Sequence, residues 1–138
     1  MKFLLELKAD YESAREIGPW LDAALRELNM PQAERAGELE LALQELAINI
    51  VDHAYANSST GRYRIELGGQ GQDVRARFFD RGKPFRSRTG VNLDEPRVGG
   101  YGLFIVEQLA EIAYERVDEE NCWTLIFGPE SPQTKESM

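Results

Sequence analysis

The chain has 138 residues, of which 42% are hydrophobic and 29% are charged, values typical of one globular domain large enough to bury a core. Its formal net charge of −8 disfavours DNA or RNA as a main partner and slightly favours basic ones. No apolar run reaches the length of about 18 residues that a membrane span needs, the start lacks a secretory signal, and the single cysteine, Cys122, fits a reducing cytoplasm.

A strand and a helix are predicted at the N-terminus. Lys2 to Ala9 alternates apolar and polar residues, which indicates a strand and a candidate sheet edge. Asp10 can cap the following helix, and Gly18-Pro19 inside its pattern predicts a kink or a restart. The apolar stripe of this helix consists of Ala14, Ile17, Leu21, Leu25 and Leu28. Asn29-Met30-Pro31 breaks the pattern and ends the helix.

The segment from Glu38 to Tyr55 is predicted to form one long amphipathic helix that begins within 31–38. Its apolar positions, at three- and four-residue steps, are Leu39, Leu43, Leu46, Ala47, Ile50 and Ala54. Glu45, Asn49 and His53 form a slanted polar row beside this stripe, with Glu45 farthest from it and His53 nearest. These side chains suit a site that holds a cation and moves a proton, although an ordinary amphipathic helix with polar flanks has the same pattern.

A hairpin with one buried face is predicted after the turn-rich loop Ala56–Gly61. Its strands are Arg62–Leu67 and Asp73–Phe79, and the glycine-rich segment Gly68–Gln72 joins them. The loop from Asp80 to Gly100 follows, and a loop of this length in a small domain is usually functional or disordered.

The C-terminal part is predicted to contain a helix and two strands. The helix covers Gly102–Ala113, and the strands Ala113–Asp118 and Cys122–Phe127 are joined by a Glu-Glu-Asn turn. The last strand is expected to be buried on both faces. The complete pattern predicts an α+β two-layer sandwich, in which three helices cover a mixed, mostly antiparallel sheet of about five strands. It forms one domain over residues 1–128, followed by a polar tail over 129–138.

Two further motifs carry chemistry. Asp80 follows a buried strand and can accept a hydrogen bond from an exocyclic amine, while Gly82 lets a ring approach the backbone. The run Gly99-Gly100-Tyr101-Gly102 opens a helix, where amide donors and the helix dipole suit phosphate oxygens. Lid arginines that could fold over phosphates are Arg86, Arg88 and Arg97. Taken singly, these features also fit a turn, a helix cap and a solvated loop.

In combination, the motifs resemble a known family. ELAINIVDHAY is similar to the N-box, FFDRGKPF to the adenine-binding box, and GGYGLFIVEQLAEIAYERVDEENCWTLIF to the last glycine box, helix and strands of the GHKL, or Bergerat-fold, ATP-binding superfamily. Within it, the chain resembles the small cytoplasmic anti-sigma-factor serine/threonine kinases of bacteria. The resemblance covers about Glu38 to Phe127.

The resemblance implies a role for each matching residue. Asn49 would ligate Mg²⁺ and Glu45 would be the general base that activates a protein hydroxyl. Asp80 would bind the adenine amino group of ATP above Gly82. Gly100 and Gly102 would let backbone amides meet the phosphates, and His53 would close the helix end against the core. Pro84 replaces the second glycine of the usual D-x-G-x-G pattern.

Two functions follow as hypotheses. The first is a cytoplasmic Mg²⁺-ATP-dependent protein serine/threonine kinase, which phosphorylates a small STAS-type antagonist in a partner-switching system and acts as an anti-sigma factor. The second is a module that binds ATP and sequesters a regulatory partner without phosphoryl transfer. A sigma factor and a second copy of the chain are further candidate partners, whereas direct contact with nucleic acid or membrane is not expected.

Overall fold

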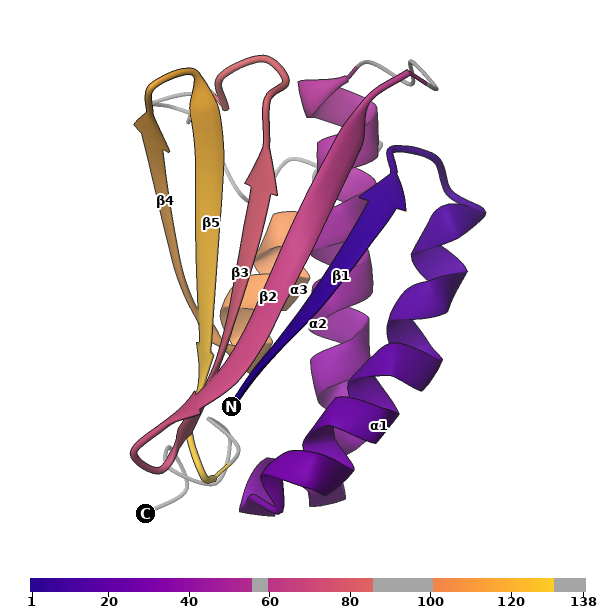
Figure 1. Ribbon diagram of the computed structural model, residues 1–138. Helices are drawn as coiled ribbons and strands as arrows, with labels where there is room; N and C mark the ends of the chain where they lie inside the picture. The colour runs from indigo at the N-terminus through magenta and orange to yellow at the C-terminus, as the bar shows by residue number, and fades with distance from the viewer. Residues whose placement is uncertain (56–59, 86–100, 131–138) are drawn as a thin grey trace.

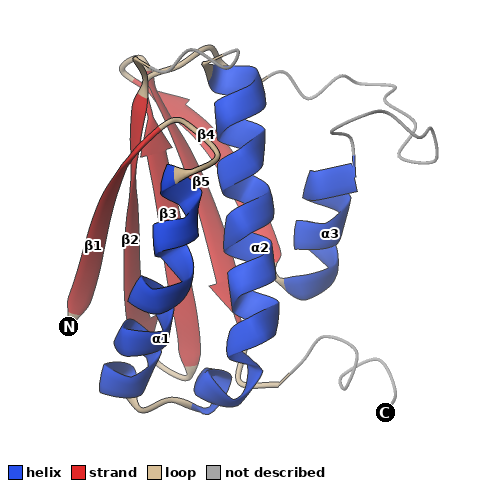
Figure 2. Ribbon diagram, turned by 90° about the vertical axis from the view of Figure 1, so that its right-hand side faces the viewer, coloured by secondary structure: helices blue, strands red, loops and turns tan. Residues whose placement is uncertain are grey.

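The computed structural model describes residues 1–55, 60–85 and 101–130, which form one layer of helices on one sheet (Figures 1 and 2). The strands are β1 (Lys2–Lys8), β2 (Arg62–Gln70), β3 (Asp73–Asp80), β4 (Glu111–Val117) and β5 (Glu120–Phe127). The helices are α1 (Ile17–Leu28), α2 (Ala36–Asn49) and α3 (Tyr101–Leu109). Two 3₁₀ turns, Ser13–Glu16 and Pro31–Arg35, precede α1 and α2, and a π-helical turn, Ile50–Ala54, follows α2. The part of the chain in view contains no helix that is long and apolar enough to cross a membrane.

The five strands are ordered β1-β2-β3-β5-β4, and all four neighbouring pairs are antiparallel. The predicted α+β two-layer fold is thereby confirmed, with a fully antiparallel sheet in place of the mixed one. The predicted position of the first strand at a sheet edge is also confirmed. β5 returns between β3 and β4, so the ends of β3 and β5 lie next to each other: Asp80 is paired with Asn121.

The core lies between the sheet and the helices, because alternation along each strand directs every second side chain toward them. On α2, the side chains of Leu39, Leu43 and Leu46 are 0% exposed, as the predicted apolar stripe requires. They face equally buried strand residues such as Ile65 and Leu125. Full burial of each such side chain stabilises the folded state by about 1.5–3 kcal/mol relative to leaving it exposed to water.

No helix of the described residues lies on the opposite face of the sheet (Figure 2), and the side chains of arginines cover part of this face. The guanidinium groups of Arg64 and Arg77 lie 4.1 and 5.0 Å from the centre of the Phe79 ring. Arg77 also donates a hydrogen bond to Sγ of buried Cys122 at 3.3 Å. The expectation that β5 is buried on both faces is right at Cys122 and wrong at Thr124 and Ile126, which are half-buried because no helix of the described residues packs over this side.

The start of the first helix follows its sequence signals. Oδ1 of Asp10 accepts a hydrogen bond from the backbone N–H of Ser13 at 2.7 Å and so caps the 3₁₀ turn. The α-helix then restarts at Ile17, which places Pro19 in its first turn, where a missing N–H costs little. The predicted cap and restart at these positions are therefore confirmed.

The C-terminal boundaries need correction. The helix predicted over Gly102–Ala113 ends at Leu109, and Glu111 already belongs to β4. The turn predicted at Glu-Glu-Asn consists instead of Asp118 and Glu119, with φ of 50° and 66°. A two-residue turn with positive φ at both positions matches the twist of a hairpin. Asn121 consequently lies within β5 and not in the turn.

Candidate functional site

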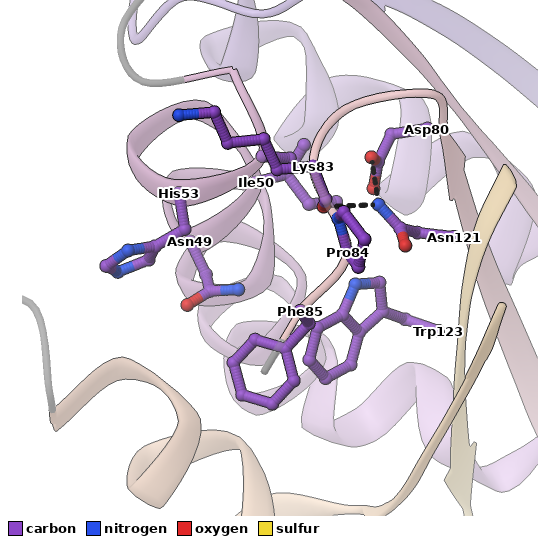
Figure 3. A pocket seen from close by; sticks show the side chains of 10 residues that line it. Asn49, Ile50, His53, Asp80, Lys83, Pro84, Phe85, Asn121 and Trp123 are labelled. Atoms are coloured by element: carbon purple, nitrogen blue, oxygen red, sulfur yellow. Dashed lines mark hydrogen bonds between the residues drawn. The ribbon is translucent and has the colours of Figure 1, made fainter. Parts of the chain in front are cut away.

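A small cavity opens between the end of α2 and the adjacent ends of β3 and β5 (Figure 3). It is lined by residues of the π-helical end of α2, of the segment after β3, and of β5. These residues are Asn49, Ile50, His53, Ala54, Asp80, Lys83, Pro84, Phe85, Asn121 and Trp123. The cavity has a volume of about 20 Å³, which is room for about one water molecule.

Asp80 is the buried carboxylate of this cavity. It ends β3 on the side that faces the helices, and it is 2% exposed. Its Oδ1 accepts hydrogen bonds from the N–H of Gly82 at 2.9 Å and from Nδ2 of Asn121 at 2.7 Å. Its Oδ2 is buried and has no hydrogen-bond partner among the described residues. Burial raises the pKa of Asp80, and the two hydrogen bonds oppose that rise only in part. The arrangement leaves one acceptor that a ligand N–H group would satisfy.

Asn49 is the last residue of α2, and its side chain is 8% exposed at the cavity. Its amide oxygen is a hard donor of the kind that Mg²⁺ prefers. The described residues contain no group of three or more His, Cys, Asp or Glu side chains that could hold a metal ion by themselves. Any ion bound at Asn49 would therefore need further oxygen ligands, and nucleotide phosphates and water have them.

The prediction that His53 closes the helix end against the core is wrong, because its side chain is exposed at the mouth of the cavity (Figure 3). The cause is the π-helical turn, in which the N–H of Tyr55 bonds the carbonyl of Ile50, five residues earlier, at 3.3 Å. The wider turn changes the direction of the side chains that follow Asn49. His53 was predicted to lie nearest the apolar stripe of the three polar residues, and it is instead the most exposed of them.

Glu45 is half-buried on α2, one turn before Asn49, and it does not line the cavity. It lies against the start of α3: a Cβ added to Gly102 would be 3.1 Å from its Oε2. The predicted site residues thus fall into two adjoining groups. Asn49 and Asp80 meet at the cavity, and Glu45 meets Gly102 where α2 and α3 pack.

Gly82 is held close to the helix end. A Cβ at this position would be 2.3 Å from the carbonyl oxygen of Ala54, and the next N–H, of Lys83, bonds that oxygen at 2.8 Å. This close approach is one reason for a glycine here; its place beneath a ring stays a prediction. Gly100 and the lid arginines Arg86, Arg88 and Arg97 lie outside the described residues.

Asn121 is a site residue that the sequence prediction missed, since it was assigned to a turn. It is 1% exposed, and its Nδ2 donates to Asp80 at 2.7 Å and to the carbonyl of Lys83 at 2.9 Å. Its Oδ1 accepts from the hydroxyl of Tyr114 and from Nη1 of Arg116, the latter at 2.9 Å. Strand parity would have found it, because it alternates with the inward-facing residues Trp123, Leu125 and Phe127.

An aromatic wall closes the other side of the cavity. The ring of Phe85 lies 4.8 Å from that of Trp123 and 5.6 Å from that of Tyr114, in edge-on arrangements. The N–H of Phe85 donates to the Tyr114 hydroxyl at 2.9 Å. A purine ring is much larger than the water-sized cavity, so we expect its entry to displace the segment from Lys83 to Phe85.

The chain matches the histidine kinase-like ATPase domain family over residues 7–127. It is 32% identical over 88 residues to the serine-protein kinase RsbW of Oceanobacillus iheyensis, a match that covers 56% of this chain and 56% of that protein. The chain thus spans about half the length of this curated relative.

Two solved structures share the fold. The catalytic domain of the histidine kinase ThkA superposes with a TM-score of 0.56 at 15% identity, covering 94% of this chain and 99% of that one. The histidine kinase domain of the blue-light activated kinase EL346 of Erythrobacter litoralis superposes with a TM-score of 0.54 at 17% identity, covering 81% and 60%. The match over 7–127 spans most of the chain, and its fold agrees. The resemblance to the Bergerat-fold ATP-binding superfamily is confirmed, and the chain belongs to the histidine kinase-like ATPase domain family.

Proposed function

We propose that this chain is a Mg²⁺-ATP-dependent protein serine/threonine kinase that acts as an anti-sigma regulatory factor. The observation that carries the nucleotide part is the buried, unpartnered Oδ2 of Asp80 beside Asn49 in one cavity. A buried acceptor without a partner costs stability, so its persistence fits a site that a ligand donor completes.

The residues around the cavity would divide the work of binding. Asp80 would accept the amino N–H of adenine through Oδ2, and Gly82 would let the base approach the backbone. Asn49 would ligate Mg²⁺ through its amide oxygen. Gly100 and Gly102 would let backbone amides at the start of α3 meet the phosphates. When bound, Mg²⁺-ATP would supply the phosphoryl group for transfer.

Glu45 would be the general base. Its carboxylate, at the junction of α2 with the start of α3, would take the proton from the hydroxyl of a partner's serine or threonine, which makes that oxygen a better nucleophile. A base of this kind contributes roughly 10²- to 10⁴-fold to a rate. Nucleotide binding alone needs no base here, so Glu45 distinguishes the kinase from a binding module.

The partners belong to the same proposal. The similarity to RsbW, a serine-protein kinase by its name, supports a protein substrate for this chain. We assign a small STAS-type antagonist as that substrate, within a partner-switching system of the bacterial cytoplasm. A sigma factor as the sequestered partner and a second copy of this chain complete the proposed set.

The kinase proposal is tested by transfer of labelled γ-phosphate from Mg²⁺-ATP into proteins of the source-cell extract. Wild type is compared with Glu45→Gln, which keeps the shape of the side chain and removes its basicity. Glu38→Gln is the matched control, because Glu38 lies on the same helix and pairs with Arg35 at 3.4 Å. We expect one small acid-stable phosphoprotein with wild type and with the control. With Glu45→Gln, labelling should fall roughly 10²- to 10⁴-fold.

The outcomes separate the two hypotheses. Unchanged labelling with Glu45→Gln would show that the base is assigned wrongly. Absence of label, together with ATP binding that Asp80→Asn abolishes, would leave a module that binds ATP without transferring phosphate. If ATP does not bind at all, the assignment of the cavity fails.

A further inference from the structure

We propose that Asn121 is a specificity-determining residue of the nucleotide site, because it occupies Oδ1 of Asp80 and so leaves Oδ2 as the one acceptor that reads the base. This inference rests on the proposed function and names a residue that the sequence motifs do not include. It starts from the hydrogen bonds around Asn121, which Figure 3 shows in part.

The orientation of the Asn121 amide is set by its neighbours. Nη1 of Arg116 lies 2.9 Å from Oδ1 of Asn121, and a guanidinium can only donate, so this atom must be the amide oxygen. The amide nitrogen therefore faces Asp80. Its two hydrogens are used at 2.7 Å by Oδ1 of Asp80 and at 2.9 Å by the carbonyl of Lys83.

The same contacts hold the backbone beside the cavity. Asn121 bonds the carbonyl of Lys83, Nη1 of Arg116 bonds the carbonyl of Gly82 at 3.0 Å, and the hydroxyl of Tyr114 accepts from the N–H of Phe85. Side chains of β4 and β5 thus hold the segment 82–85 from the side of the sheet. Two of its carbonyls are engaged, which leaves fewer acceptors for a ligand.

The result is a selective arrangement of donors and acceptors. Oδ1 of Asp80 receives two N–H groups, from Gly82 and Asn121, whereas Oδ2 receives none from the part of the chain that the structure describes. A purine with an amino group at position 6 can donate to Oδ2. A purine with a carbonyl there would place an acceptor against Oδ2 of Asp80. The carbonyl oxygen and Oδ2 would then face each other without a donor between them, which costs binding.

Asn121 controls this selectivity in two ways. Its N–H keeps the carboxylate from turning, so Oδ2 remains the oxygen of Asp80 that is open to a donor at the cavity. It also helps to stabilise the charged form of Asp80 against burial, and only the charged form presents an acceptor at both oxygens. Without this donor, Asp80 can turn or take up a proton, and a protonated carboxyl can donate to a 6-carbonyl.

The test compares dissociation constants of Mg²⁺-ATP and Mg²⁺-inosine triphosphate, measured by titration calorimetry on the full chain. Inosine triphosphate carries a 6-carbonyl in place of the 6-amino group. Wild type should prefer ATP by roughly 100-fold, since a hydrogen bond to a charged group is at stake. Asn121→Leu should lower that preference roughly tenfold or more, and Asn121→Thr, which keeps one donor, should retain most of it. Thr124→Val, on the same strand but on the open face, should match wild type.

A second variant keeps the test decisive if Asn121→Leu does not fold, as judged by circular dichroism and thermal melting. Asn121→Asp has the same shape and places a carboxyl 2.7 Å from Oδ1 of Asp80, where the two groups must share a proton. Its preference for ATP should fall and become dependent on pH, because the shared proton changes which oxygens can accept.

The failures are distinguishable. Equal weakening of both nucleotides in the Asn121 variants, with an unchanged ratio, would reduce Asn121 to a structural residue and overturn this inference alone. Absence of ATP binding by wild type would overturn the proposed function together with it.

Discussion

The inner faces of β3 and β5 carry two different kinds of residue along the same pair of strands. At one end, the paired residues are Val74 with Phe127 and Ala76 with Leu125, all 0% exposed. At the other end, Asp80 is paired with Asn121, and these polar side chains are as well buried as the apolar ones. Alternation sends both sets toward the helices, so strand geometry alone does not explain the difference.

Energetics do explain it. The apolar end stabilises the fold simply by leaving water, at about 25 cal/mol per Å² of buried apolar surface. The polar end costs free energy, because a buried carboxylate must be compensated by hydrogen bonds and one oxygen of Asp80 is not. Under the proposed function, this cost is retained for binding and not for stability. The two ends should therefore respond oppositely to mutation.

The largest effect is expected at the apolar end. Leu125→Ala should lower the free energy of unfolding by about 2–5 kcal/mol, since a fully buried side chain is lost and a cavity remains. Urea denaturation measures this. The neighbouring Ile126→Ala, at a half-buried position on the open face, should cost clearly less. Equal costs for both would contradict the assignment of the core to one face.

A smaller effect is expected where the helix end meets the segment after β3. Gly82→Ala should lower the free energy of unfolding by about 1–3 kcal/mol, because its Cβ would be 2.3 Å from the carbonyl oxygen of Ala54 and backbone must shift. Thermal unfolding and ATP titration should both detect the change. Gly37→Ala is the matched control: nothing lies within 4 Å of its Cβ, and it should stabilise α2 by up to about 1 kcal/mol. A neutral Gly82→Ala would refute the close approach.

At the polar end, a substitution should raise stability relative to wild type, and the residue to replace is Asp80. Burial raises the pKa of Asp80 above the ordinary 3.8, so between these two pKa values the folded state binds more protons than the unfolded state. The stability of wild type should therefore fall as pH rises through the raised pKa, and it should recover on acidification toward 3.8. Asp80→Asn lacks this titration.

The comparison needs urea denaturation of both proteins at several pH values. The stability of Asp80→Asn relative to wild type should rise with pH in this window, while its ATP binding is lost. A relative stability that falls with pH would mean that Asp80 is stabilised in its charged form. The comparison of the two strand ends would then fail.

Much of this molecule could be predicted from its sequence, because periodicity reports which faces are buried. The apolar stripe of α2 and the alternation of β2 and β3 predicted the two layers of the fold. The order and spacing of the motifs predicted that Asn49 and Asp80 belong to one site. The polar end of β5 was missed for a physical reason. The turn before it uses positive φ at Asp118 and Glu119, and Glu119 is not the Gly that signals such a turn at its second position, so Asn121 was taken for part of the loop.

The π-helical turn was hidden for a similar reason. Ile50 and Ala54 continue an ordinary helical pattern, and nothing local marks the change to an i→i+5 hydrogen bond. Contacts made by distant segments accompany that change, such as the bond from the N–H of Lys83 to the Ala54 carbonyl. Sequence periodicity contains no information about such contacts, so the direction of His53 could not be read from it.

The size of the cavity has a consequence for every binding measurement on this chain. The cavity of about 20 Å³ is smaller than a purine, and the ring of Phe85 lies against Trp123, so we expect a purine to enter molecules in which the segment 83–85 has moved. The observed dissociation constant then equals the intrinsic one divided by the fraction of open molecules. Tyr114→Phe removes the acceptor for the Phe85 N–H and one of the two donors to Oδ1 of Asn121, and Arg116 still holds that oxygen. The variant should therefore tighten apparent binding by enlarging the fraction of open molecules. Affinity in this domain would then depend partly on an equilibrium that exists before any nucleotide arrives.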